Sequence, residues 1–135
     1  MKRKGYRFLE HTADTGLKIY APSREEVFET AAKGLLTLLT EETPQPGEKR
    51  SVSLTAESAE YLLADFLNEI LYLMAHERWG PSRVSVDLQG SSLRACLEGS
   101  PLKEDFRNEV KAATWHRLSL KETDGRWEAT IFFDL

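Results

Sequence analysis

The sequence has few of the features that mark disulfide-rich, zinc-binding or membrane-spanning proteins. Cys96 is the only cysteine among 135 residues, which excludes an intrachain disulfide and a cysteine-based zinc cluster. We expect Cys96 to be a small buried hydrophobic residue of a strand, and a nucleophilic role is the less favoured alternative. No apolar run is long enough to span a bilayer, and the first residues do not resemble a signal peptide. We therefore expect a cytoplasmic protein.

Basic residues are not in excess either. The formal net charge is −4, so no global positive field would attract nucleic acid. The sequence also lacks a glycine-rich phosphate loop, a nucleophile elbow and a His-Glu-x-x-His helix. These absences disfavour an RNA-binding module and predict that the chain is not an enzyme in its own right.

The apolar spacing predicts a fold with more strands than helices. Ser23 and Glu26 form a capping box for one helix, Ser58 caps a longer one that Gly80 and Pro81 end, and Asp124-Gly125 predicts a tight hairpin. The expected helices span 23–42 and 58–78, and the expected strands 6–10, 16–21, 51–56, 84–88, 93–97, 110–121 and 126–134. We predict that residues 1–135 form a single α+β domain, with two main helices packed on a largely antiparallel sheet in two layers.

Acidic residues lie at both ends of the chain. One group is the segment Glu10-His11-Thr12-Ala13-Asp14, followed by an expected turn at Asp14-Thr15-Gly16; the other is Asp134, followed by Leu135 and its terminal carboxylate. If the fold brings Asp14 beside Asp134, three hard oxygen donors converge on one small volume. Such charges either raise a carboxyl pKa or recruit a cation, and oxygen ligands favour Ca²⁺, Mg²⁺ or Mn²⁺.

Other polar residues near these segments have two interpretations each. His11 is either a ligand or a turn histidine that bonds the backbone. His116 is expected on an apolar strand face, where a satisfied core residue and a functional group are equally favoured. For Lys111 we favour a salt bridge with Glu10 or Asp14 over a phosphate contact or a solvated charge.

The less apolar side of the long helix carries Asp65 and Glu69. A solvated helix face is the favoured interpretation, and contact with a partner protein is the alternative. Trp79, Trp115 and Trp127 are too scattered to predict a base-stacking platform and are expected in the core or at its rim.

Four segments, in order along the chain, resemble the archease family. They are Phe8-Leu9-Glu10-His11-Thr12-Ala13-Asp14 with Gly16, Phe66-Leu67-Asn68-Glu69-Ile70-Leu71-Tyr72, Glu109-Val110-Lys111-Ala112-Ala113-Thr114-Trp115-His116, and Asp134-Leu135. No segment is decisive alone, but four in this order are specific, and they extend from one end of the chain nearly to the other.

The resemblance implies an accessory protein of the RtcB-type RNA ligase, which joins tRNA halves after intron removal. It implies that the chain promotes guanylylation of the ligase by GTP, which forms a covalent GMP–histidine intermediate on the ligase, and allows multiple turnover. It further implies a divalent-cation site at Asp14, Asp134 and Leu135, a strand–helix–strand–strand module, and contact with tRNA only through the ligase. The alternatives are a small metal-dependent hydrolase acting on its own, or an RNA- or protein-binding module.

Overall fold

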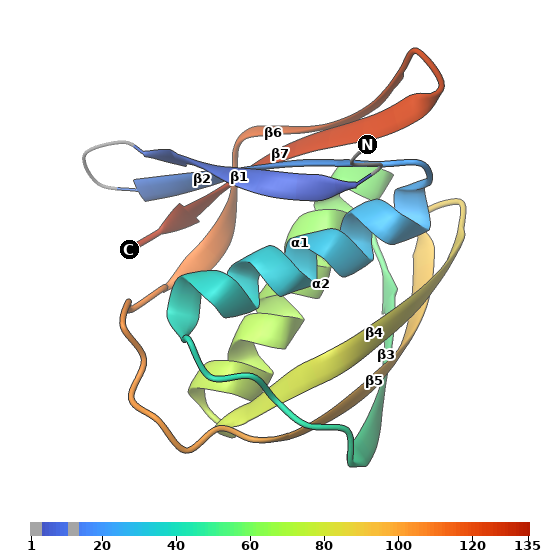
Figure 1. The fold of residues 1–135 in the computed structure, drawn as a ribbon. Helices are drawn as coiled ribbons and strands as arrows, with labels where there is room; N and C mark the ends of the chain where they lie inside the picture. The colour runs from blue at the N-terminus through green and yellow to red at the C-terminus, as the bar shows by residue number, and fades with distance from the viewer. Residues whose placement is uncertain (1–3, 11–13) are drawn as a thin grey trace.

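The computed structural model describes residues 4–10 and 14–135, and two antiparallel sheets enclose two helices there (Figure 1). The elements are β1 (Gly5–Glu10), β2 (Asp14–Ala21), α1 (Arg24–Leu39), β3 (Glu48–Thr55), α2 (Ala59–Ala75), β4 (Trp79–Gln89), β5 (Ser92–Pro101), β6 (Ala112–Thr123) and β7 (Arg126–Asp134). This confirms the predicted α+β class with two helices packed on antiparallel strands. The strands divide between two sheets, and the helices lie between them.

The first sheet has the strand order β1-β2-β7-β6, so the N-terminal hairpin lies against the last strand of the chain. Alternate residues of β2 and β7 face the helices: Leu17 pairs with Ile131 and Ile19 with Ala129, and all four are buried. This period of two confirms the predicted alternation in both strands. It also fixes the register that decides which residues meet at the ends of β2 and β7.

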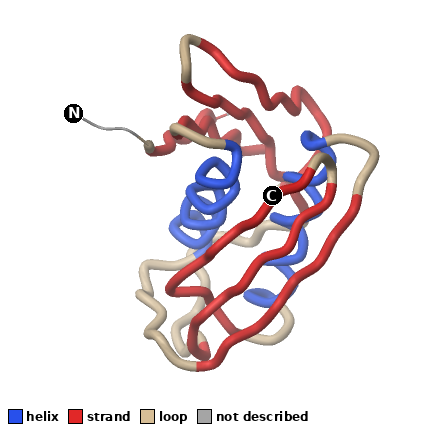
Figure 2. Tube along the Cα trace, turned by 90° about the vertical axis from the view of Figure 1, so that its right-hand side faces the viewer, coloured by secondary structure: helices blue, strands red, loops and turns tan. Residues whose placement is uncertain are grey.

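The second sheet has the order β3-β5-β4 and holds α2 between β3 and β4 in sequence. This is the expected strand–helix–strand–strand module. Figure 2 shows it from another side, with its three strands side by side. No helix in the described part of the chain is long and apolar enough to cross a membrane.

Both helices begin where the sequence predicts. The Ser23 hydroxyl accepts a hydrogen bond from the Glu26 N–H at 3.2 Å, and Ser58 accepts one from Tyr61 at 3.2 Å, so each serine satisfies a free N–H of a first turn. The predicted stripe of α2 is confirmed, since its large apolar residues are buried on several sides: Leu62, Leu63, Phe66, Leu67, Ile70, Leu71, Leu73 and Met74.

The helix ends, one turn and the burial of Cys96 differ from the prediction. Cys96 is exposed and not buried, because the alternation of β5 turns it away from the core. The helix α2 ends at Ala75, and Gly80 and Pro81 lie inside β4, where they pair with β5. Proline is tolerated there because β4 is an edge strand that needs hydrogen bonds on one side only. The strand β2 begins at Asp14, so Gly16 is a strand residue and not part of a turn. The predicted Asp124-Gly125 hairpin turn is confirmed, with φ of 52° and 79°.

A candidate metal centre at the edge of the first sheet

Asp14 and Asp134 lie directly opposite each other at the ends of β2 and β7. The Asp134 carbonyl oxygen accepts a hydrogen bond from the Lys111 N–H at 2.8 Å, so the main chain of Asp134 is directed toward β6 and not toward Asp14. The two aspartates are therefore a non-hydrogen-bonded pair, the arrangement in which opposite side chains come closest, with Cα atoms about 4.5 Å apart. Both carboxylates project from the same face of the sheet, the face away from the helices.

The environment of Asp14 leaves one of its oxygens without a partner. Asp14 is half-buried, and its Oδ1 atom is inaccessible to solvent and accepts no hydrogen bond from residues 4–10 or 14–135. Among the described side chains, no ion pair involves Asp14 or Asp134. A buried carboxylate oxygen without a donor is costly unless a cation approaches it. The residues present therefore fit a hard divalent cation that lies between the two carboxylates.

The protein supplies few ligands for such an ion. In the described part of the chain, no three side chains of His, Cys, Asp or Glu gather closely enough to hold a metal. Asp14 and Asp134 thus provide two carboxylates, and Leu135, which is 42% exposed, is the next residue along the chain. Water or a partner would complete the coordination shell. Metal binding by these three residues stays a prediction.

Gly16 and Phe132 form the apolar part of the site, which the sequence analysis missed. The two residues are cross-strand partners, two positions along from the aspartates and on the same face. A Cβ atom at Gly16 would lie 2.6 Å from the Phe132 ring, so the ring lies across the glycine. Phe132 is only 3% exposed although it faces away from the helices. A glycine two residues after Asp14 in an alternating strand is the signal that could have revealed this close approach.

His116 covers the outer side of Phe132. The two rings meet edge to face with centroids 5.8 Å apart, and His116 is exposed. The predicted apolar face of β6 is wrong at this point, because the register shifts between Thr114 and Ser119, and Arg117 in this stretch has φ of 55°. The irregularity breaks the alternation, so Ala113 is buried and His116 is not a core residue. His116 lies on the outer face of the sheet, the face that carries the two aspartates.

Lys111 lies beside the acidic pair through its backbone. Its side chain is exposed and makes no ion pair with a described side chain, so the preferred salt bridge to Asp14 is not present. Glu10 pairs with Thr15 in the register of β1 and β2, but its side chain is outside the described part of the structure. His11 also lies outside the described residues.

Asp65 and Glu69 are half-buried on α2, the helix that packs against β6. Asn68, between them, holds the helix to this strand: its Oδ1 accepts from the Ala113 N–H at 2.8 Å, and its Nδ2 donates to the Ala113 carbonyl at 3.1 Å. These two bonds satisfy the N–H and the carbonyl of Ala113 on the unpaired side of β6, which is an edge strand of the first sheet. Asn68 therefore fixes the position of the segment that leads to Lys111.

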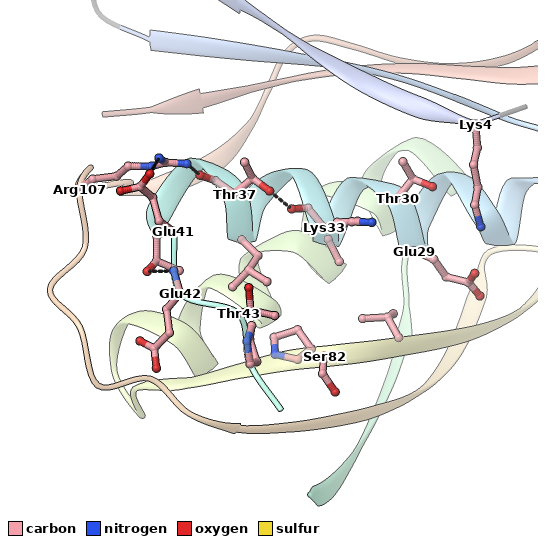
Figure 3. Close-up of a pocket in the computed structure, with 16 residues that line it drawn as sticks. Lys4, Glu29, Thr30, Lys33, Thr37, Glu41, Glu42, Thr43, Ser82 and Arg107 are labelled. Carbon is pink, nitrogen blue, oxygen red and sulfur yellow. Dashed lines mark hydrogen bonds and ion pairs between the residues drawn. The ribbon is translucent and has the colours of Figure 1, made fainter. Parts of the chain in front are cut away.

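A separate cavity lies away from the two aspartates. It has a volume of about 600 Å³ and lies between α1 and β4 (Figure 3). Its acidic groups already have structural partners: Glu29 accepts from the Val86 N–H at 3.0 Å, Glu41 pairs with Arg107 at 3.5 Å, and Glu42 accepts from two main-chain N–H groups of the loop after β5. Neither aspartate of the candidate site lines this cavity. The three smaller cavities described in residues 4–10 and 14–135 do not include Asp14 or Asp134 either, and Asp134 is exposed.

Comparison with known proteins gives one consistent result. Residues 6–135 match the Archease protein family. The chain is 33% identical to the protein archease of Methanosarcina mazei, over 98% of this chain and 97% of that protein, and 34% identical to that of Methanothermobacter thermautotrophicus, over 98% and 99%. It also resembles a solution structure of a Methanobacterium thermoautotrophicum protein (TM-score 0.79, 31% identity, 97% and 99% of the two chains). A crystal structure described as an archease and possible chaperone from Thermotoga maritima is similar as well (TM-score 0.67, 28% identity, 94% of each chain).

Proposed function

The chain belongs to the archease family, and from this membership and the paired aspartates we propose that it activates an RtcB-type RNA ligase in the cytoplasm. In this proposal it is a protein cofactor and not an enzyme. It promotes guanylylation of the ligase by GTP and so permits repeated turnover. The observation that carries the proposal is the direct pairing of Asp14 with Asp134, with the buried Oδ1 of Asp14 lacking a donor among the described residues.

The geometry suggests how this edge would act on another protein. Asp14 and Asp134 would hold a divalent cation, with a main-chain oxygen of Leu135 as a third ligand. Both side chains lie at strand ends on an outer face, and Asp134 and Leu135 are exposed, so a second protein can reach the ion. A bound Ca²⁺, Mg²⁺ or Mn²⁺ would neutralise charge on the GTP phosphates. Asp14 and Asp134 would position the ion. Lys111, whose N–H donates to the Asp134 carbonyl, and His116, which packs on Phe132, would lie beside the nucleotide site of the ligase.

A single-turnover guanylylation assay with an RtcB-type ligase and labelled GTP tests the proposal. Wild-type protein should accelerate guanylylation, and Asp14→Ala and Asp134→Ala should abolish the acceleration. Asp87→Ala provides a matched control, since Asp87 is an exposed carboxylate on β4 in the other sheet. No acceleration by the wild type, or equal acceleration by all four proteins, would contradict the proposal.

The alternative functions have less support. A metal-dependent hydrolase needs an enclosed pocket around its ion, and the 600 Å³ cavity does not include the aspartate pair. An RNA-binding module needs a basic face, and the net charge is −4. Incubation of the pure protein with phosphoester substrates and Mn²⁺ would reveal hydrolysis directly, and turnover that Asp14→Ala removes would favour the hydrolase.

A further inference from the structure

Two exposed aromatic side chains on one side of the molecule each pack against a neighbouring ring. Trp115 is 64% exposed and Tyr72 is 50% exposed. Trp115 packs on Tyr61 with ring centroids 4.7 Å apart, and Tyr72 stacks on His76 at 4.9 Å. Large aromatic groups that are already ordered lose little entropy on binding, and they are enriched at the centres of protein interfaces. The prediction that Trp115 lies in the core or at its rim is wrong, and a tryptophan exposed to this extent is a candidate contact residue.

The two aromatic pairs belong to one continuous surface. Tyr61, Asp65, Glu69, Tyr72 and His76 recur at helical spacing, so they share one face of α2. Trp115 comes from β6, which Asn68 joins to the same side of the helix. We call these six residues (Tyr61, Asp65, Glu69, Tyr72, His76 and Trp115) the α2–β6 surface.

The α2–β6 surface leads to the candidate metal centre. A hollow of about 220 Å³ lies at one end of it, lined by Tyr72, His76 and Lys111 among others. The Lys111 N–H donates to the carbonyl oxygen of Asp134. A protein that contacts the hollow would therefore be adjacent to the acidic edge of the first sheet. The hollow has the size of a site for one side chain of a partner.

The charge of the surface indicates the kind of partner. Asp65 and Glu69 lie between the aromatic pairs, are half-buried, and form no ion pair with a described side chain. Carboxylates in this position would repel the phosphates of a nucleic acid and attract lysine or arginine. Aromatic contacts beside unpaired acidic groups thus suit a basic protein surface.

We propose that the α2–β6 surface is the docking surface for the ligase, which presents a basic patch and inserts one side chain into the hollow beside Tyr72. This inference depends on the proposed function, because it names where the same partner binds. The acidic edge acts on the nucleotide site, and the α2–β6 surface supplies affinity. Substitutions in the two places should therefore have different kinetic effects.

The test measures binding and guanylylation with the same ligase. Trp115→Ala and Glu69→Lys should each weaken binding about 10- to 100-fold, which is the range for residues at the centre of an interface. In the guanylylation assay they should raise the concentration needed for half-maximal acceleration and leave the maximum unchanged. Asp14→Asn should instead remove acceleration at every concentration. Asp87→Lys is the control for charge reversal on an exposed strand position and should change binding less than twofold.

The outcomes separate the docking surface from the proposed function. If the wild type neither binds the ligase nor accelerates it, the proposed function fails. If the wild type binds, and Trp115→Ala and Glu69→Lys bind equally well with unchanged unfolding temperatures, the docking surface is overturned and the function stands. Self-association or RNA binding that Trp115→Ala removes, with ligase binding unaffected, would also overturn it by assigning the surface to another partner.

Discussion

Asp14→Asn should make the protein more stable without divalent ions and less stable with them. Two unit charges about 5 Å apart repel by about 0.8 kcal/mol in water and by about 3 kcal/mol at an effective dielectric constant of 20. Because Asp134 is exposed, the lower value applies, at about 1 kcal/mol. The substitution removes this repulsion and breaks no hydrogen bond between Oδ1 and the part of the chain that the structure describes. For a chain of 135 residues the unfolding temperature in chelator should rise by about 4 °C.

Added Ca²⁺ should reverse that order. An ion present at 100 times its dissociation constant stabilises the folded wild type by about 2.7 kcal/mol, which corresponds to about 10 °C. Asp14→Asn should lose this gain, so the two melting curves should exchange order between chelator and Ca²⁺. Asp87→Asn serves as the control, with the full Ca²⁺ response. Calorimetric or fluorescence melting in both buffers measures the effect, and a variant that is less stable in chelator yet gains as much from Ca²⁺ would refute the reasoning.

Three further substitutions test the parts of the fold that position the site. Gly16→Ala should destabilise the protein by about 1–3 kcal/mol, because its Cβ would overlap the Phe132 ring; urea unfolding measures this, and an unchanged midpoint would contradict the close contact. Asn68→Ala should lower the free energy of unfolding by about 2 kcal/mol through loss of both hydrogen bonds to Ala113. Hydrogen exchange at the Ala113 N–H should become faster, and an unchanged exchange rate would show that these two bonds do not hold β6 to α2. Ser58→Ala should lower the free energy of unfolding by about 1 kcal/mol through loss of the N-cap of α2. Thermal unfolding followed by the helical circular-dichroism signal measures this, and a midpoint equal to that of the wild type would contradict the role of the cap.

Local patterns in the sequence predicted most of the elements. The alternation in β2 and β7, the serine caps of both helices and the Asp124-Gly125 turn each depend on residues close together in the chain. Physical rules for strands, caps and turns apply to such short segments without knowledge of the fold. Element boundaries were less accurate, because Gly80 and Pro81 are acceptable inside an edge strand.

The site was predictable only in part, because it depends on pairing between distant strands. The sequence offered Asp14 and Asp134 as a conditional pair, and the register of β2 and β7 brings them together. The register shift in β6 was not visible in the sequence, so His116 was expected on an apolar face, and Trp115 in the core or at its rim. The contact between Gly16 and Phe132 also requires knowledge of which strands are neighbours. The sequence therefore indicated which side chains could bind a cation, but the pairing of distant strands decides which residues surround them.

The most direct measurement is an anomalous-scattering map from crystals of the protein grown with Mn²⁺. The proposed site predicts one peak between the ends of β2 and β7, with carboxylate oxygens of both Asp14 and Asp134 about 2.0–2.4 Å from the ion. The peak should be absent from crystals of Asp14→Asn. A wild-type map with no peak at this edge, or with the two carboxylates turned apart toward solvent at saturating Mn²⁺, would contradict the central claim that these strand ends together bind a divalent cation.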